Sequence, residues 1–407
     1  MDTLKNLIKK SETKIVLIVL DGVGDLPLKD GKTPLEYANT PNLDNLAKNS
    51  ALGLHIPVDY GITPGSGPAH LGIFGYEPLK INIGRGVLEA LGLGLELKET
   101  DVAVRGNFAT VKYEDGIPIV IDRRAGRIST EENKNLIKYL SQKFSYIEDA
   151  QIILKSGMEH RFVVIFRFPY KISSEVETIN DTDPQVVGKS PLKPSGKGEL
   201  AKKVSKIAEI FSERVAELLK NESKANYVLL RGFSVKPELE TFEEKFGLKA
   251  CCIATYPMYK GLASLVGMKL IEFEGMGIRD EIETLKIQWN NFDFFFLHIK
   301  KTDSAGEDGN FEMKVKIIEE FDSFLPEILP LNPSVLCITG DHSTPCILKS
   351  HSWHPVPVLI SSSYVLGKTS ERFTEREALK GELGIFYAHK LMPLLLAHAQ
   401  RLKKYGA

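Results

Sequence analysis

Three short apolar runs in this chain each lead into acidic residues. The run IVLIVL precedes Asp21, and the aromatic run FDFFFLHI leads toward Asp303. A third run, VLCIT, leads through one glycine into Asp341 and His342. Continuous apolar runs bounded by glycine and charged residues are typical of strands buried on both faces in a parallel sheet. Because ligand sites in such sheets lie beyond the carboxyl ends of the strands, we expect the three aspartates to converge there.

Converging carboxylates repel one another, at a cost of roughly 4 kcal/mol per close pair in a medium of intermediate dielectric. Bound cations would remove that cost, so the pattern suggests a metal site. The alternative interpretation is that the three aspartates are unrelated and that each caps the helix or turn that follows its strand.

The hydrophobic pattern also divides the chain into segments that differ in the spacing of their apolar residues. Buried strands alternate with helices up to residue 94 and again from residue 239, whereas residues 95–238 contain shorter alternating segments typical of antiparallel strands. Apolar residues at helical spacing predict a long amphipathic helix over residues 199–221. The predicted fold class is therefore α/β. A mostly parallel sheet flanked by helices, from residues 1–94 and 239–407, carries an inserted α+β domain at 95–238.

Composition narrows the classes of function. The 407 residues include 52 Lys and Arg against 53 Asp and Glu, which does not suggest nucleic acid or an anionic membrane as a partner. The N-terminal apolar run is too short for a signal peptide, and no stretch reaches the length of a membrane span. The four cysteines lack metal-type spacing, which indicates free thiols in a reducing cytoplasm. The oligomeric state stays open.

The loop TPGSGPAH places Ser66 between two glycines and two prolines. Glycines permit a tight turn and close approach of a ligand to the backbone. A serine hydroxyl is a weak nucleophile at neutral pH unless a base or a metal activates it, and Asp21, Asp341 and His342 could hold that metal. A simple Gly-Ser-Gly turn is the alternative.

Seven segments together resemble a known family. VLDGVGD, TPGSGPAHLGIFGY, DRRAGR, ATYPMYKGLASLVGM, TDSAGEDG, TGDHSTP and HSWHPVPVLI occur in the motif order of the archaeal-type, cofactor-independent phosphoglycerate mutases. These belong to the alkaline phosphatase superfamily, so the resemblance implies an alkaline-phosphatase-like core. It also implies an isomerase that interconverts 3-phosphoglycerate and 2-phosphoglycerate in glycolysis and gluconeogenesis. An active-site serine takes the phosphoryl group, glycerate reorients, and no bisphosphoglycerate cofactor is needed.

The resemblance further implies two divalent metal ions. The first would be held by Asp21, Ser66, Asp341 and His342, and the second by Asp303, Glu307 and His351. Glu307 is a departure, because the family motif has histidine four residues after the aspartate. Asp308 or His354 could substitute as the ligand, or this site could be weak. Mixed carboxylate and imidazole ligands favour manganese, with magnesium, cobalt and zinc as alternatives.

Substrate recognition falls to the inserted domain, because the planar fork of arginine suits both phosphate and carboxylate. The candidate contacts are Arg123, Arg124, Arg127, His160, Arg161 and Arg231. Surface arginines paired with glutamates are the alternative, although the three arginines of DRRAGR repel one another unless an anion is present.

Two further catalytic roles are expected. Lys260 matches the active-site lysine of the family and would activate Ser66 and stabilise the charge on the phosphoryl group. Asp183, or its neighbour Asp181, is the candidate general base for the glycerate hydroxyl. Four histidines are expected to be structural, namely His55, His298, His389 and His398.

Two other functions compete with the mutase. A metal-dependent phosphomonoesterase, or a phosphotransferase for another small phosphorylated metabolite, would keep Ser66 and the metals but use the arginines for a different acceptor. A non-catalytic binding protein would follow if Glu307 marked a lost metal site.

Overall fold

A computed structural model describes residues 3–81 and 83–406, which form two compact units. The first unit contains the residues up to 82 and those from Leu239 onward, and the second unit is Ile83–Glu238. The second unit thus begins at Ile83 rather than at residue 95. The difference is helix α5 (Arg85–Gly92), which packs on two strands of the second unit so closely that a side chain at Gly86 would collide with their backbone.

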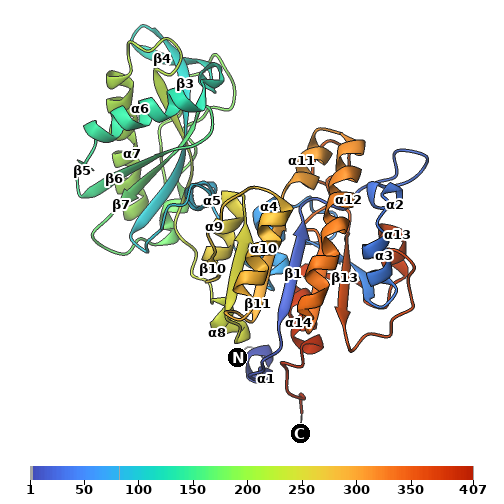
Figure 1. The fold of residues 1–407 in the computed structure, drawn as a ribbon. Coiled ribbons are helices and arrows are strands. Elements are labelled where there is room, and N and C mark those ends of the chain that lie inside the picture. Colours follow the sequence, from blue (N-terminus) through green and yellow to red (C-terminus); the bar gives the residue numbers. More distant parts are fainter. Residues whose placement is uncertain (1–2, 82, 407) are drawn as a thin grey trace. The chain divides into compact units, whose positions relative to one another are not determined.

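The first unit is built on an eight-stranded sheet (Figure 1). Its strands, in spatial order, are β10 (Lys269–Leu270), β9 (Ala250–Ala254), β11 (Phe294–Ile299), β1 (Ile15–Leu20), β12 (Val335–Thr339), β13 (Val356–Ser362), β2 (Ala51–Ile56) and β14 (Gly384–Tyr387). Only β13 runs antiparallel to its neighbours. The sheet is therefore mostly parallel, as the apolar runs predicted.

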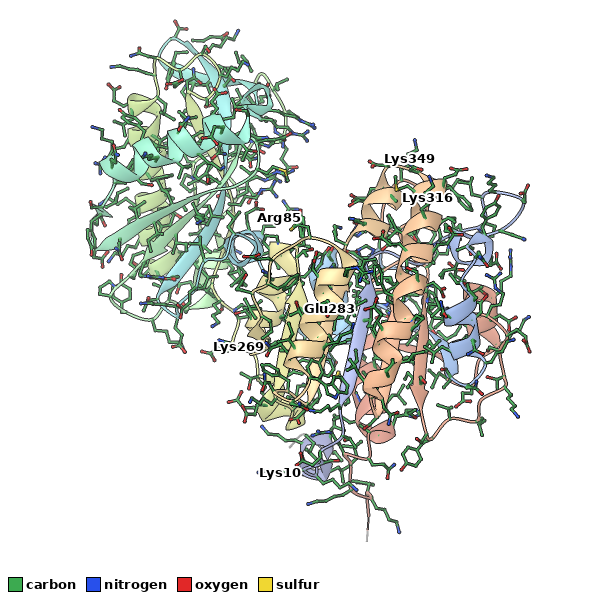
Figure 2. The ribbon with its side chains drawn as sticks, in the orientation of Figure 1. Lys10, Arg85, Lys269, Glu283, Lys316 and Lys349 are labelled. Atoms are coloured by element: carbon green, nitrogen blue, oxygen red, sulfur yellow. The ribbon has the colours of Figure 1, made fainter. Side chains whose placement is uncertain are left out.

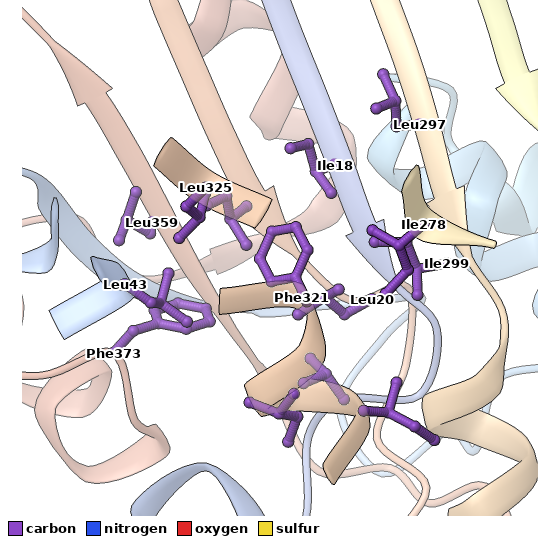
Figure 3. Close-up of a cluster of buried hydrophobic side chains, with 14 of the residues drawn as sticks. Ile18, Leu20, Leu43, Ile278, Leu297, Ile299, Phe321, Leu325, Leu359 and Phe373 are labelled. Atoms are coloured by element: carbon purple, nitrogen blue, oxygen red, sulfur yellow. The ribbon is translucent and has the colours of Figure 1, made fainter. Parts of the chain in front are cut away.

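Helices cover this sheet. They are α1 (Thr3–Leu7), α2 (Pro34–Tyr37), α3 (Pro41–Ala47), α4 (Ser66–Ile73), α8 (Phe242–Phe246), α9 (Pro257–Leu265), α10 (Ile278–Gln288), α11 (Lys301–Glu307), α12 (Phe311–Ile328), α13 (Glu375–Lys380) and α14 (Leu391–His398). Ile18 and Leu20 of β1 pack against Phe321 and Leu325 of α12 in one continuous core cluster (Figure 3). Every residue of β1 is buried, so both faces of this central strand are covered.

The order of the central strands positions the chemistry. Strands β11, β1 and β12 are adjacent and parallel, so their carboxyl ends lie at one edge of the sheet. Asp21 follows β1 directly, Asp303 lies in the first turn of α11 after β11, and Asp341 follows β12 after one glycine. The predicted convergence of the three aspartates is confirmed.

The second unit contains a six-stranded antiparallel sheet. Its strands are β4 (Ile117–Asp122), β3 (Asp101–Glu114), β7 (Arg161–Arg167), β6 (Ala150–Ser156) and β5 (Tyr146–Ile147), with β8 (Tyr227–Ser234) paired to β3. Helices α6 (Thr130–Lys143) and α7 (Glu199–Leu218) share one apolar core with these strands. The predicted long helix is α7, with its apolar residues buried.

Two further sequence observations concern the whole chain. The four cysteines are buried and free. Across residues 3–81 and 83–406, none of the helices combines the length and apolar character needed to cross a membrane.

Candidate active site

Ser66 is the first residue of α4, where free backbone N–H groups and the helix dipole favour an anion. Its Oγ lies 3.4 Å from Nε2 of His342. One turn later, Nδ1 of His70 lies 2.9 Å from the Ser66 carbonyl oxygen and 3.2 Å from an oxygen of Asp341. The loop before Ser66 is held from the other direction by His351, whose Nδ1 lies 2.9 Å from the carbonyl oxygen of Pro64. Ser66 is therefore fixed to the acidic edge of the sheet.

Asp21, Asp341 and His342 form the first possible ligand group, and all three are fully buried. Among the described residues, Oδ1 of Asp21 and Oδ2 of Asp341 have no hydrogen-bond partner. Histidine nitrogens are the nearest groups to them, with Nε2 of His342 at 3.5 Å from Oδ1 of Asp21 and at 3.2 Å from Oδ2 of Asp341. A buried carboxylate oxygen that lacks a full hydrogen bond is costly, because it has lost its water. These two oxygens, with the imidazole and the nearby Ser66 hydroxyl, fit a divalent cation.

Asp303, His342 and His351 form the second possible ligand group. Nε2 of His351 lies 3.5 Å from Oδ1 of Asp303 and 3.8 Å from Oε1 of Glu307. The rings of His342 and His351 stack at 3.6 Å, which places the two groups side by side. Glu307 therefore lies beside this group without being one of its three members.

Neither alternative ligand joins these groups among the described residues. Nδ1 of His354 lies 3.0 Å from the Ser352 hydroxyl, and the ring of His354 stacks on Trp353. Asp308 caps the end of α11. Glu307 is outside both groups as well, and its 3.8 Å approach to His351 is the contact that distinguishes it from these two residues. Its role as a ligand stays a prediction.

The aspartates of the first group are surrounded by histidines. Burial alone would raise the pKa of Asp341, but His342 and His70 hold that pKa well below its usual value. Burial and Asp341 likewise push the pKa of Asp21 upward, and His298 and His342 more than offset that effect. Both carboxylates are therefore ionised at neutral pH, as metal ligands must be.

Three residues at this cluster were missed or misjudged from the sequence. The Tyr259 hydroxyl donates a 2.5 Å hydrogen bond to Asp21, and His298, expected to be only structural, stacks on Tyr259 and lies 3.3 Å from Asp21. The Lys300 ammonium lies 3.2 Å from Asp21 and also donates to Asp303. Burial alone would lower the pKa of Lys300, but these two carboxylates raise it above its usual value.

The position of Tyr259 bears on the expected role of Lys260. Consecutive residues of a helix point about 100° apart, so a helix that turns Tyr259 toward Asp21 turns Lys260 elsewhere. The Lys260 ammonium lies 3.0 Å from Glu272, and no contact with Ser66 is seen among the described residues. Activation of Ser66 by Lys260 stays a prediction, and the lysine beside the acidic cluster is Lys300.

Among the described residues, the other histidines expected to be structural belong to neither possible ligand group. Nε2 of His55 lies 2.9 Å from the carbonyl oxygen of Gly340, and burial lowers the pKa of His55 to about 4. Nδ1 of His398 lies 2.8 Å from the Ser362 hydroxyl, and the ring of His389 stacks on Tyr387.

A second site lies within the second unit. All six residues predicted to bind substrate line one cavity of about 170 Å³, namely Arg123, Arg124, Arg127, His160, Arg161 and Arg231. Arg105 and Asn107 of β3 also line it and were missed, because nothing in their local sequence suggests a ligand. We call this cavity the arginine pocket. Six arginines face only two carboxylates in its wall, so it favours an anion.

Several buried polar atoms in the arginine pocket lack partners among the described residues. They are Nε of Arg105, Oδ1 of Asn107, Nδ1 of His160 and Nε of Arg161. Burial, and next the charge of Arg161, lower the pKa of His160 to about 4, so this histidine is neutral at pH 7. Unpaired donors around a small cavity are the arrangement that a multiply charged anion would satisfy.

The turn that carries three of the arginines is tightly held. The Asp122 carboxylate accepts hydrogen bonds from the backbone N–H groups of Arg124 and Gly126, at 2.7 and 2.8 Å. Ala125 and Arg127 both adopt positive φ, near 50°, which is costly for residues with a side chain. Such strain is a recurrent feature of ligand-binding turns.

Asp183, the candidate general base, is buried in a two-pronged ion pair with Arg123 at 2.8 Å for both contacts. Burial alone would raise the pKa of Asp183, but Arg123 and the Gln185 N–H lower it. Its neighbour Asp181 accepts hydrogen bonds from Nε of Arg231 and the N–H of Gly232. These pairings favour a role for both aspartates in positioning arginines.

Comparison with known proteins identifies the family. The model of the Metalloenzyme superfamily matches residues 13–398. A protein from Aquifex aeolicus, named "Probable 2,3-bisphosphoglycerate-independent phosphoglycerate mutase", is 66% identical over 407 residues and 100% of both chains. This chain belongs to that mutase family. A relative of the same name from Thermotoga maritima is 53% identical over 99% of this chain and 98% of its own.

Solved structures support the mutase family membership. A protein from Pyrococcus horikoshii has a TM-score of 0.81 and 34% identity, covering 97% of this chain and 99% of its own. The cofactor-independent phosphoglycerate mutase from Thermoplasma acidophilum has a TM-score of 0.75 and 30% identity, covering 95% and 100%. The mixed α/β fold described above is therefore the fold of this family.

One buried lysine ties together the loops that carry the mutase ligand groups. The Lys314 ammonium, fully buried on α12, donates to the carbonyl oxygen of Gly22 at 2.8 Å, to Asp25 at 2.8 Å and to the carbonyl oxygen of Thr344 at 2.9 Å. The Asp25 carboxylate also accepts the N–H of Cys346. Lys314 thus joins the segment after Asp21 to the segment after His342.

We expect Lys314→Met to lower the free energy of unfolding of the first unit by about 3–5 kcal/mol, because Asp25 would stay buried without its partner. Urea denaturation followed by tryptophan fluorescence measures this unit, since both tryptophans, Trp289 and Trp353, lie in it. The control is Lys316→Met, an exposed position on the same helix (Figure 2). Equal denaturation midpoints for the two variants would show that the Lys314 network is not needed.

Proposed function

We propose that this protein interconverts 3-phosphoglycerate and 2-phosphoglycerate through a phosphoserine at Ser66. Its family supplies the reaction. The observation that carries the proposal is Ser66 itself, which lies at a helix N-terminus with its hydroxyl 3.4 Å from His342 in a buried cluster of carboxylates and imidazoles. Such a position suits an oxygen that accepts a phosphoryl group and later returns it.

In the first step the Ser66 oxygen forms a bond to phosphorus and the bond from phosphorus to the substrate oxygen breaks. The Ser66 hydroxyl loses its proton, and the departing glycerate oxygen gains one. Glycerate then turns, and its other hydroxyl loses its proton and forms a bond to phosphorus. The bond from phosphorus to the Ser66 oxygen breaks, and Ser66 recovers a proton. The sum is an isomerisation that neither consumes nor releases inorganic phosphate.

The residues would hold two divalent ions. Asp21, Ser66, Asp341 and His342 suit one, and Asp303, Glu307 and His351 suit the other. When bound, such ions lower the pKa of an attacking oxygen and neutralise charge on a transferred phosphoryl group. The donor set combines carboxylates with imidazoles, so we propose manganese as the metal.

The arginine pocket would bind the anionic groups of the substrate. Six arginines suit a molecule that carries both a phosphate and a carboxylate, because each guanidinium can donate two parallel hydrogen bonds. Asp181 and Asp183 would orient Arg231 and Arg123 for this contact. With its pKa lowered by Arg123, Asp183 is a weak base, so we assign it to positioning rather than to proton transfer.

The function is tested by phosphorus NMR of the protein with 3-phosphoglycerate and manganese. We expect a 2-phosphoglycerate signal that grows to a fixed ratio without inorganic phosphate, and no conversion by Ser66→Ala, which lacks the accepting oxygen. Release of inorganic phosphate alone would instead assign the protein to the phosphomonoesterases. No conversion with any divalent metal would exclude this substrate.

The role of Glu307 is tested by manganese titration in a calorimeter. Removing a carboxylate ligand in Glu307→Ala should weaken one of two binding events by about 10–100-fold and leave the other unchanged. Glu307→His should restore two events and shift the preference toward zinc. Asp308→Ala is the matched control, because its carboxylate is the neighbouring one. If Asp308→Ala weakens binding and Glu307→Ala does not, the ligand assignment is wrong.

The role of the arginine pocket is tested with two arginines of strand β7. Nε of Arg161 has no partner within the described chain, whereas Arg167 pairs with Asp101 at 2.7 and 2.8 Å. Arg161→Gln should raise KM for 3-phosphoglycerate about 10–100-fold, the effect of one lost charged hydrogen bond, without lowering the melting temperature. Arg167→Gln should lower the melting temperature and leave KM unchanged. The reverse pattern would remove Arg161 from substrate binding.

A further inference from the structure

A further cavity of the second unit, which we call the large cavity, has a volume of about 610 Å³, and the arginines discussed above do not line it. It lies between helix α7, the hairpin of strands β3 and β4, and the segment 190–194. Tyr113, Ile117, Pro118, Leu192 and Tyr227 give it a largely apolar wall. This volume is in the range that holds a small organic molecule.

Polar groups in the wall indicate what such a molecule would carry. Ser212 is 7% exposed, and its Oγ has no hydrogen-bond partner among the described residues. Three glutamates of α7 also line the cavity, and two of them are neutralised. Glu209 lies 2.8 Å from the ammonium of Lys193, and Glu217 lies 2.6 Å from that of Lys220.

Glu213 is the third glutamate, and no ion pair joins it to a lysine or arginine within the described chain. The wall therefore carries three carboxylates against two ammonium groups, a net charge of one negative, beside two tyrosine rings. Aromatic faces attract both flat rings and cations. A buried hydroxyl without a partner, an unpaired carboxylate and two tyrosines together fit a flat apolar body that bears a single positive charge.

We propose that this cavity binds a small aromatic molecule with one amine cation, and that its occupation strengthens anion binding in the arginine pocket. The cation pairs with Glu213, the ring packs between the tyrosines and the prolines, and a polar atom reaches Ser212. The effect on anion binding rests on the proposed function of the arginine pocket, whereas binding to the cavity itself does not.

The two cavities share one short segment of chain. Thr182 lines the large cavity, and its neighbour Asp183 lines the arginine pocket. The carbonyl oxygen of Thr182 accepts the N–H of Leu192, and the side-chain amide of Asn180 donates to the carbonyl oxygen of Lys193. A molecule that packs against segment 190–194 would therefore restrain residues 180–183.

Restraining this segment acts on the arginines directly. Asp181 and Asp183 hold Arg231 and Arg123 through the contacts described above. A receptor whose side chains are already fixed loses less conformational entropy when its ligand binds. Occupation of the large cavity is thus expected to lower the Kd for 3-phosphoglycerate.

The first experiment measures binding of tryptamine to the whole protein by calorimetry at pH 7.5. Indole-3-propionate, which has the same ring with a carboxylate instead of the amine, is the matched probe. We expect tryptamine to bind at least tenfold more tightly than indole-3-propionate. Glu213→Gln should weaken tryptamine binding at least fivefold, and Glu199→Gln, on α7 but outside the cavity wall, should not.

Filling the cavity gives an independent check. Ala216→Phe places a ring in the cavity wall and should abolish tryptamine binding. If that variant fails to fold, Glu213→Gln, at an exposed position, decides the question alone. Equal affinity for the two probes, no measurable tryptamine binding, or an unchanged affinity in Glu213→Gln would each overturn the proposal.

The second experiment measures the Kd of 3-phosphoglycerate with and without saturating tryptamine. We expect at least a threefold decrease in Kd for the wild type and no change for Glu213→Gln. An unchanged Kd in the wild type would overturn the coupling. If 3-phosphoglycerate does not bind at all while tryptamine does, the proposed function fails and the cavity assignment stands.

Discussion

The structure of the first unit depends on one constraint, the burial of three carboxylates at the same edge of a sheet. Parallel strands β11, β1 and β12 must deliver Asp303, Asp21 and Asp341 to neighbouring positions away from water. Ionised groups in such a place need compensation from nearby donors and cations. The lysine, tyrosine and histidine contacts around them supply part of it, and two oxygens, Oδ1 of Asp21 and Oδ2 of Asp341, still lack a hydrogen bond among the described residues.

The second unit also gathers charges of one sign, and there the excess charge is positive. Its arginine pocket gathers six guanidinium groups around about 170 Å³, and two carboxylates cannot neutralise them. The unpaired donors there cost free energy until an anion binds. The first unit therefore has excess negative charge and the second unit has excess positive charge. Divalent cations would balance the carboxylates, and a phosphorylated acid would balance the arginines. Pre-formed sites of this kind bind through charge without large rearrangement.

Sequence patterns reveal candidate ligands that follow a local signal, such as the end of a predicted strand. They miss groups whose partners lie far away in the sequence. Asp21, Asp341 and His342 follow strand signals, and the arginines of DRRAGR are adjacent, so all could be predicted. His70, Tyr259 and Lys300 reach Asp341 or Asp21, which are distant from them in sequence, and no local pattern marks those contacts. Recognising that Tyr259 faces Asp21 and Lys260 does not required the rotation of α9, and placing the domain boundary required knowing which sheet α5 packs on.

In the proposed second metal site, Glu307 would replace the histidine of the family motif. An imidazole adds no charge at neutral pH, whereas a carboxylate adds one negative charge 3.8 Å from His351. That charge attracts every divalent ion, but the Glu307 side chain is 55% exposed, so water screens much of the attraction. What would remain, under the proposed ligand set, is the change of ligand atom from nitrogen to oxygen, which disfavours zinc relative to manganese. In that proposal the substitution would act on which metal binds more than on whether a metal binds.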